Sequence, residues 1–281
     1  MMHQQDWLKY VATEEQLRQF NDEGYLIVED ALTPDLLGRL NEAVDGVEKN
    51  ERAAKGLGPD DMVAKFRTVV EDDTFLDLLD NPKTFPLLWD ILGWNIQLYI
   101  SHLIVYPPEK KGGDINKGGW HQDGGRPVPE MERPHPRLSL KISYWLSDVT
   151  SPENGAMEII PGSHKLDTKP EGCDSGVGVM PVCVKAGSAV LFDRRMWHRR
   201  GINTSDITRR VLFFGYSYRW LRGLDYNNLP EEVLSKCDPI RRQLLGDGVD
   251  VKGWWQPTEA DVPLKGWLRD HRGEDYVKAM G

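Results

Sequence analysis

A histidine and an aspartate two residues apart, His121 and Asp123, are the residues of this sequence with the clearest potential for chemistry. Alternate side chains of an extended strand project from the same face, so this imidazole and carboxylate would lie side by side. Two histidines and one carboxylate form the facial triad that binds Fe(II) and leaves coordination positions open. The pair therefore predicts two of the three ligands of a mononuclear iron site.

A third ligand and an anion-binding residue have candidates further along the chain. His198 follows Trp197 near the end of the central region, and the apolar stretch 206–214 contains Arg209 and Arg210. A strand there would place a guanidinium beside the metal, where the carboxylate of a co-substrate could bind. A His-x-Asp pair alone is common, but the ordered set is more specific. We therefore expect a dependence on iron and 2-oxoglutarate.

Short strands separated by turns must position these residues. The apolar run 96–106, closed by Pro107-Pro108, and the run 138–146 predict two core strands. Gly187-Ser188 opens another strand, 189–192, which leads to His198. Many short strands with turns between them are typical of a barrel or jelly roll.

The predicted strand 138–146 has an apolar face and a mostly polar face. The second face carries Ser139, Lys141, Ser143 and Trp145. Such a face normally contacts solvent, which is the simpler interpretation. The alternative is that it lines a polar cavity inside a barrel, and the presence of Trp145 favours this.

Helices and loops are expected on both sides of the strand region. Residues 13–20 and the stretch that begins at Thr33-Pro34 predict helices, 25–28 a short strand, 50–62 a surface loop and 75–92 a helix. Beyond Trp220 the chain is expected to be irregular or helical. We expect one domain over 1–281, with N-terminal support (1–95), a jelly-roll core (96–220) and a C-terminal cover (221–281).

Composition excludes several classes of protein. The net charge is −9 and no basic block occurs, so a nucleic-acid partner is not expected. The three cysteines are widely spaced, which predicts neither a disulfide framework nor a zinc site. The sequence has no secretory-signal pattern and no membrane-spanning apolar run. We expect a soluble, cytoplasmic protein without a membrane partner.

Several segments together resemble the phytanoyl-CoA dioxygenase family of Fe(II)- and 2-oxoglutarate-dependent oxygenases. The similarity extends from about Thr13 to Trp220. It rests on the opening pattern from Phe20 to Val28, Trp-His-Gln-Asp from Trp120, Tyr-Trp-Leu-Ser-Asp-Val from Tyr144, Glu-Asn-Gly-Ala-Met-Glu-Ile-Ile-Pro-Gly-Ser-His from Glu153, and the span from His198 through Asn203 to Arg209.

The resemblance implies a fold and a set of site residues. The fold would be mainly β with flanking helices around a double-stranded β-helix core, a cupin-like jelly roll. His121, Asp123 and His198 would bind the iron. Arg209, eleven residues after His198, would bind the far carboxylate of 2-oxoglutarate. Arg210 is the adjacent alternative, but its side chain would point to the opposite face of the strand.

The resemblance also implies three further residues at the co-substrate. Trp145 matches an aromatic position beside 2-oxoglutarate, His102 a position that contacts it, and Lys65 an upstream lysine. Each has an ordinary alternative, namely a core tryptophan, a core histidine and a surface lysine.

The family's reaction would hydroxylate an unactivated C–H bond with O2 and release succinate and CO2, with ascorbate as a supporting reductant. The absence of a basic patch favours a small-molecule metabolite as substrate over an acyl-CoA. Trp254 and Trp255 would form a lid or a structural buttress, and Arg126 would bind a substrate anion or be solvated. Desaturation, epoxidation or cyclisation at the same site, a non-catalytic binding protein and a zinc hydrolase are the alternatives.

Overall fold

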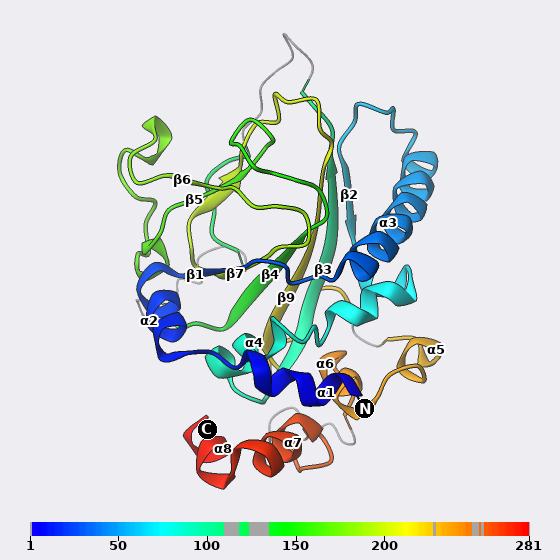
Figure 1. Ribbon diagram of the computed structural model, residues 1–281, viewed down its shortest axis with the longest axis vertical. Coiled ribbons are helices and arrows are strands. Elements are labelled where there is room, and N and C mark those ends of the chain that lie inside the picture. Colours follow the sequence, from blue (N-terminus) through cyan, green and yellow to red (C-terminus); the bar gives the residue numbers. More distant parts are fainter. Residues whose placement is uncertain are drawn as a thin grey trace. The chain divides into compact units, whose positions relative to one another are not determined.

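The computed structural model describes residues 2–109, 118–123, 135–226, 229–248, 253 and 256–280 (Figure 1). Its helices are α1 (Met2–Asp6), α2 (Glu14–Glu23), α3 (Pro34–Lys55), α4 (Phe85–Leu92), α5 (Glu231–Leu234), α6 (Pro239–Leu244), α7 (Pro263–Arg272) and α8 (Glu274–Ala279). Its strands are β1 (Tyr25–Val28), β2 (Val63–Phe66), β3 (Ile96–Tyr106), β4 (Ser139–Trp145), β5 (Met157–Ile159), β6 (Met180–Val182), β7 (Ala189–Asp193), β8 (His198–Arg200) and β9 (Arg209–Tyr218).

The strands form two sheets. One has the order β1-β7-β4-β9-β3-β2 and the other the order β6-β5-β8. Strand β7 pairs antiparallel with both β1 and β4, and β5 pairs antiparallel with both β6 and β8. Several neighbours in the larger sheet are distant in sequence, and this order brings β4, β7 and β9 together from separate parts of the chain.

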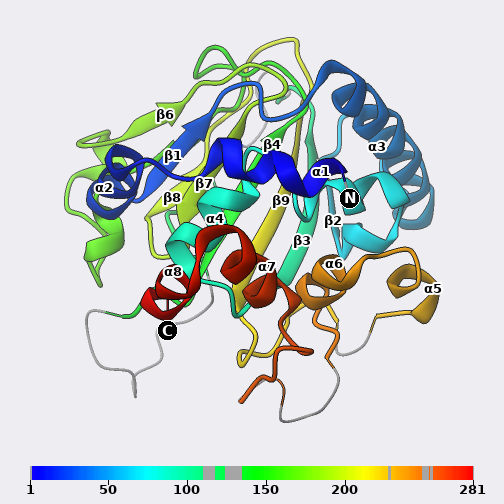
Figure 2. The ribbon, with the colours of Figure 1, turned by 60° about the horizontal axis from the view of Figure 1, so that its bottom comes forward.

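Contacts within the chain divide it into two units. The strand-rich unit comprises 14–65 and 102–213, and the helix-rich unit comprises 1–13, 66–101 and 214–281. The core of the strand-rich unit includes Trp145, Ile159, Phe192 and Val211, all fully buried. Helix α3 lies beside β2 in both views (Figures 1 and 2). Arg210 of β9 anchors this helix through ion pairs with Asp45 (2.7 Å) and Glu48 (3.1 Å).

Aromatic side chains form the centre of the helix-rich unit. Trp7 packs edge-on against Phe85, Trp89 and Trp267, with ring centroids 4.9–5.7 Å apart. Helix α7, which carries Trp267, continues into α8 (Figure 2). The hydroxyl of Tyr276 in α8 donates to Asp90. The prediction that the region after Trp220 is irregular or helical is therefore confirmed for the described residues.

Two predicted elements differ from the structure. Residues 50–55, predicted as loop, extend α3, because Glu48–Arg52 and Glu51–Lys55 pair one turn apart and Gly56 ends the helix in the left-handed conformation. The predicted helix 75–92 is interrupted between the 3₁₀ helix Asp73–Leu78 and α4. Asn81 precedes Pro82, a position that disfavours helical backbone.

Within the described residues no helix is long and apolar enough to cross a membrane. The compartment, the absence of a nucleic-acid partner and the organisation as one domain over 1–281 stay predictions.

Candidate metal and co-substrate site

A single β-bridge brings two of the predicted metal ligands together. His121 and His198 exchange backbone hydrogen bonds, each with an N···O distance of 3.0 Å. Two residues further on, the Asp123 amide donates to the carbonyl of Arg194 at 2.7 Å. The potential ligand atoms of His121, Asp123 and His198 consequently lie within 4.8 Å of one another. The structure thus assembles all three residues, although the sequence places the third 75 residues beyond Asp123.

Backbone carbonyls orient both imidazoles. The Nδ1 atom of His121 lies 2.9 Å from the carbonyl oxygen of Gly119, and that of His198 lies 2.9 Å from that of Met196. Each Nδ1–H therefore donates to a carbonyl, and Nε2 carries the free lone pair. Both Nε2 atoms face Asp123, at 4.0 Å from its Oδ1 for His121 and 3.5 Å from its Oδ2 for His198. This is the tautomer that a metal site needs.

A buried lysine that we did not predict as a site residue contacts the carboxylate. The Nζ atom of Lys141 lies 2.9 Å from Oδ2 of Asp123. Burial alone would raise the pKa of Asp123, but the charges of Lys141, His198 and His121 lower it to about 2. Burial, together with the charges of His121 and Lys141, lowers the pKa of His198 to about 4. At neutral pH the site therefore offers a carboxylate and a neutral imidazole.

Arg209 is a buried cation with aromatic neighbours. Its side chain donates from one terminal nitrogen to the carbonyl of Gly155 at 2.6 Å and lies 5.2 Å from the ring of Tyr106 and 5.8 Å from that of Trp145. Burial and the nearby charge of Arg200 lower its pKa to about 10. No carboxylate pairs with it among the residues whose placement is described. A buried guanidinium without a counter-charge is suited to an anionic ligand.

Arg210 points to the opposite face of β9, as predicted, where it pairs with α3. The neighbouring arginines thus have different environments, because successive side chains of a strand alternate between its two faces. This geometry favours Arg209 over Arg210 as the partner of a co-substrate carboxylate.

The other predicted co-substrate residues lie in three settings. Trp145 is fully buried near Arg209 and donates to the Ser143 hydroxyl at 3.1 Å. His102 stacks on Phe213 at 4.6 Å, and burial together with the charge of Lys141 lowers its pKa to about 3. Lys65 pairs with Glu51 at 3.4 Å. The roles of all three at the co-substrate stay predictions.

The polar face of β4 does not contact solvent. All seven residues of this strand are buried, including Ser139, Lys141 and Ser143. The simpler interpretation was therefore wrong, and the burial agrees with the alternative that this face points into the barrel, while the polar cavity itself stays a prediction. The indole of Trp145 on that face was the sequence signal that could also have identified Lys141.

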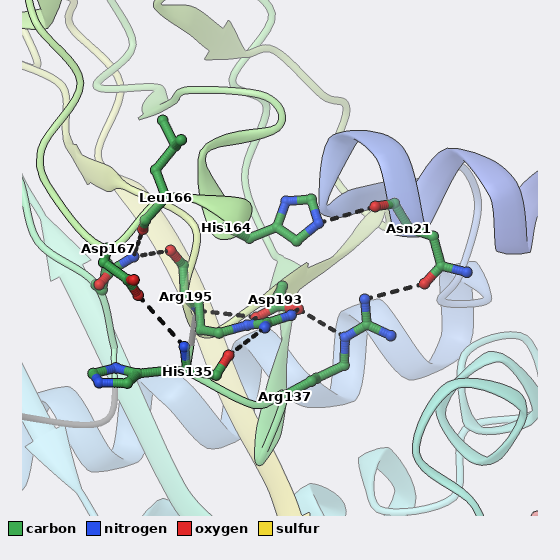
Figure 3. Close-up of polar contacts among 9 residues, drawn as sticks. Asn21, His135, Arg137, His164, Leu166, Asp167, Asp193 and Arg195 are labelled. Atoms are coloured by element: carbon green, nitrogen blue, oxygen red, sulfur yellow. Dashed lines mark hydrogen bonds and ion pairs between the residues drawn. The ribbon is translucent and has the colours of Figure 1, made fainter. Parts of the chain in front are cut away.

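A buried ion-pair network supports the turn between β7 and β8 (Figure 3). The Asp193 carboxylate, fully buried, accepts from Arg195 at 2.7 and 2.9 Å and from Arg137 at 2.7 Å. Gln122, between the two ligands of the first motif, donates to the carbonyls of Arg195 and Leu166. The network therefore fixes both sides of the bridge that pairs His121 with His198.

Arg126, Trp254 and Trp255, which the sequence suggested for substrate binding, lie outside the described residues.

The donor set suits Fe(II). Two neutral imidazoles and a carboxylate are the ligands of mononuclear iron sites that leave coordination positions open. The deprotonated Asp123, the carbonyl-bound Nδ1 atoms and the unpaired Arg209 are all present before any ligand binds. The residues thus fit both a divalent metal and a dicarboxylate.

Known proteins resemble this chain in sequence. A sequence model of the phytanoyl-CoA dioxygenase (PhyH) family matches residues 20–211, more than half of the chain. The probable alpha-ketoglutarate-dependent hypophosphite dioxygenase of Stutzerimonas stutzeri is 27% identical over 237 residues, which cover 72% of this chain and 78% of the relative.

Solved structures share the fold. HygX from Streptomyces hygroscopicus, with nickel and 2-oxoglutarate bound, superposes with a TM-score of 0.62 at 17% identity, covering 78% of this chain and 91% of that one. The non-heme alpha-ketoglutarate-dependent carbocyclase SnoK from nogalamycin biosynthesis has a TM-score of 0.59 at 20% identity, covering 85% and 94%. The predicted mainly β fold, with flanking helices and a jelly-roll core, is thereby confirmed.

Proposed function

The chain belongs to the phytanoyl-CoA dioxygenase family, and we propose that it hydroxylates an unactivated C–H bond of a small-molecule metabolite, releasing succinate and CO2. The observation that carries this proposal is the convergence of His121, Asp123 and His198 in the strand-rich unit that also buries the unpaired Arg209.

Membership of the family confirms the resemblance that the sequence predicted. It also confirms the enzyme class, an Fe(II)- and 2-oxoglutarate-dependent dioxygenase that uses O2. The residue roles, the hydroxylation outcome and the substrate belong to the proposal.

In this proposal each residue has one task. His121, Asp123 and His198 hold Fe(II) through Nε2, a carboxylate oxygen and Nε2, and Arg209 binds the far carboxylate of 2-oxoglutarate with its planar fork. Bound iron and 2-oxoglutarate together supply the oxidising chemistry, with O2 as oxidant. Tyr106 and Trp145 wall the guanidinium off from water, which strengthens its attraction for the carboxylate.

A second outcome, desaturation, epoxidation or ring closure, uses the same protein groups. SnoK is described as a carbocyclase, so this fold hosts ring closure as well. A non-catalytic binding protein is less well supported, because three side chains that could hold a metal ion converge and Arg209 is buried in the same unit. A zinc hydrolase would leave Arg209 without a partner.

The test is an anaerobic titration with Fe(II), with and without 2-oxoglutarate, that follows the weak visible charge-transfer band of the chelate. We expect the band in the wild type, its loss in His121→Ala and its weakening in Arg209→Ala. His271→Ala, which removes an exposed imidazole in the helix-rich unit, is the matched control and should behave as wild type.

A wild-type protein that binds Fe(II) but forms no chelate with 2-oxoglutarate would exclude the proposed reaction and favour a binding protein. Succinate release with a panel of metabolites, followed by mass analysis of the product, would separate hydroxylation from desaturation and ring closure.

A further inference from the structure

Lys141 is a buried cation at the metal ligands that the proposed reaction leaves without a task. It is 7% exposed, and its Nζ atom lies 2.9 Å from Asp123 Oδ2 and 6.0 Å from the ring centroid of Phe213. Among the described residues Asp123 is the carboxylate that pairs with it. The ammonium therefore lies on an apolar wall with one counter-charge, which is also a proposed metal ligand.

The charges at the site do not cancel when the site is loaded. Lys141 and Arg209 are cations and Asp123 is an anion, so the protein contributes a net charge of +1. Arg200 and Glu109, 3.9 Å apart, offset each other. Fe(II) and the 2-oxoglutarate dianion also cancel, so +1 remains. The far carboxylate of 2-oxoglutarate would neutralise the charge of Arg209. The remaining positive charge therefore lies near Lys141.

Uncompensated charge in a buried site is unfavourable, and an ammonium group there needs an anion. When Asp123 ligates a dication, the carboxylate's charge is shared between the metal and Lys141, which weakens the hold on the ammonium. We propose that Lys141 binds an anionic group of the primary substrate, such as a carboxylate, phosphinate, phosphonate or sulfonate, beside the iron. This inference rests on the proposed function and names the substrate class for that site.

The experiment uses the full chain loaded anaerobically with Fe(II) and 2-oxoglutarate, because the chelate band responds to a ligand that binds beside the metal. Formate, propionate and methylphosphonate are the probes, and propionamide is the uncharged analogue of propionate. The variants are Lys141→Met, which keeps the length of the side chain without its charge, and the control Lys185→Met at an exposed lysine.

We expect at least one anion to perturb the wild-type band, and propionamide to leave it unchanged. Lys141→Met should weaken the binding of that anion by about tenfold to a hundredfold, because one charged hydrogen bond is lost. Lys141→Met should still form the chelate with Fe(II) and 2-oxoglutarate, and Lys185→Met should match the wild type throughout.

Three results would overturn the inference. Equal anion binding by wild type and Lys141→Met would place the anion on the iron alone, and a response to none of the anions would remove the subsite. Loss of the 2-oxoglutarate chelate in both Lys141→Met and Lys141→Gln, with the fold retained by circular dichroism, would make Lys141 a support of Asp123 or of the co-substrate. Absence of the chelate band from the wild-type protein would be a different result, because it would contradict the proposed function on which this inference rests.

Discussion

At the scale of single residues, environment separates side chains of the same type. Arg209 and Arg210 are neighbours, yet one is buried beside Tyr106 and Trp145 and the other pairs with two carboxylates of α3. The structure thus separates Arg209, which we propose for an anion, from Arg210, which pairs with α3.

Arg209→Lys should weaken 2-oxoglutarate binding by about tenfold or more while Fe(II) affinity is retained, because an ammonium group cannot form the paired hydrogen bonds of a guanidinium fork. Isothermal titration of the metal-loaded protein measures this directly. Arg210→Lys is the matched control, for which co-substrate affinity should not change. A similar loss in both variants would contradict the assignment.

At the scale of elements, the site depends on how strands and turns are held together. Strand β7 ends at Asp193, whose carboxylate pairs with Arg195 in the following turn and with Arg137. Strand β8 pairs with β5, and the bridge from His198 to His121 continues that arrangement. The positions of the proposed metal ligands therefore depend on a buried ion-pair network and on strand pairing.

Asp193→Asn should lower the free energy of unfolding of the metal-free protein by about 3–5 kcal/mol, because two guanidinium groups lose their buried counter-charge. Urea denaturation measures the change. The same substitution at the exposed Asp22, which pairs with Lys165 at 3.2 Å, should have a much smaller effect.

The effect of Asp193 should depend on pH. Burial alone would raise the pKa of Asp193. The hydrogen bonds and charges of Arg195 and Arg137 outweigh burial, so the pKa of Asp193 is lowered in the folded state. A lowered folded pKa contributes stability above the unfolded value, about 3.9, and that contribution is lost as the pH falls through the folded pKa. The difference between wild type and Asp193→Asn should therefore narrow below about pH 4. A difference that grows on acidification would contradict the pairing.

Gly201 tests the close approach of the segments at β5 and β8, and Gly46 in α3 provides a contrasting control. A Cβ atom on Gly201, which follows β8, would lie 2.2 Å from the carbonyl oxygen of Ala156, so Gly201→Ala should destabilise the fold by about 1–3 kcal/mol. Gly46 lies in α3 with open space around it, and Gly46→Ala should stabilise by about 0.5–1 kcal/mol. Thermal unfolding of both variants checks the opposite signs, and equal effects would contradict the close approach of these strands.

At the scale of the whole molecule, an acidic protein has cationic groups at its candidate site. The net charge is −9, yet Lys141 and Arg209 are both buried. The family match ends at residue 211, so most of the helix-rich unit lies outside it.

Metal binding should stabilise the fold. A divalent ion that binds only the native state adds about 2.7 kcal/mol to the free energy of unfolding at a free concentration of one hundred times its Kd. Redox-inert Zn(II) should therefore raise the melting temperature of the metal-free protein, and a chelator should reverse the shift. His121→Ala should show no such shift, and an equal shift in this variant would place the ion elsewhere.

The sequence by itself was sufficient to predict the enzyme class, its cofactors and much of the framework of the site. The order of the motifs and the strands 25–28 and 96–106 are properties of local sequence, where side-chain period and strand propensity act directly. Within the described residues 118–123, the strand expected at His121 and Asp123 is not formed, because His121 makes only an isolated β-bridge with His198. Only the tertiary structure showed that both faces of β4 are buried, since a period of two defines two faces without saying whether the polar one contacts solvent. The tertiary structure also determined the partners of Lys141 and Asp193. Ion pairs between segments distant in the chain depend on the order of the strands in the sheet, which cannot be read from residue spacing.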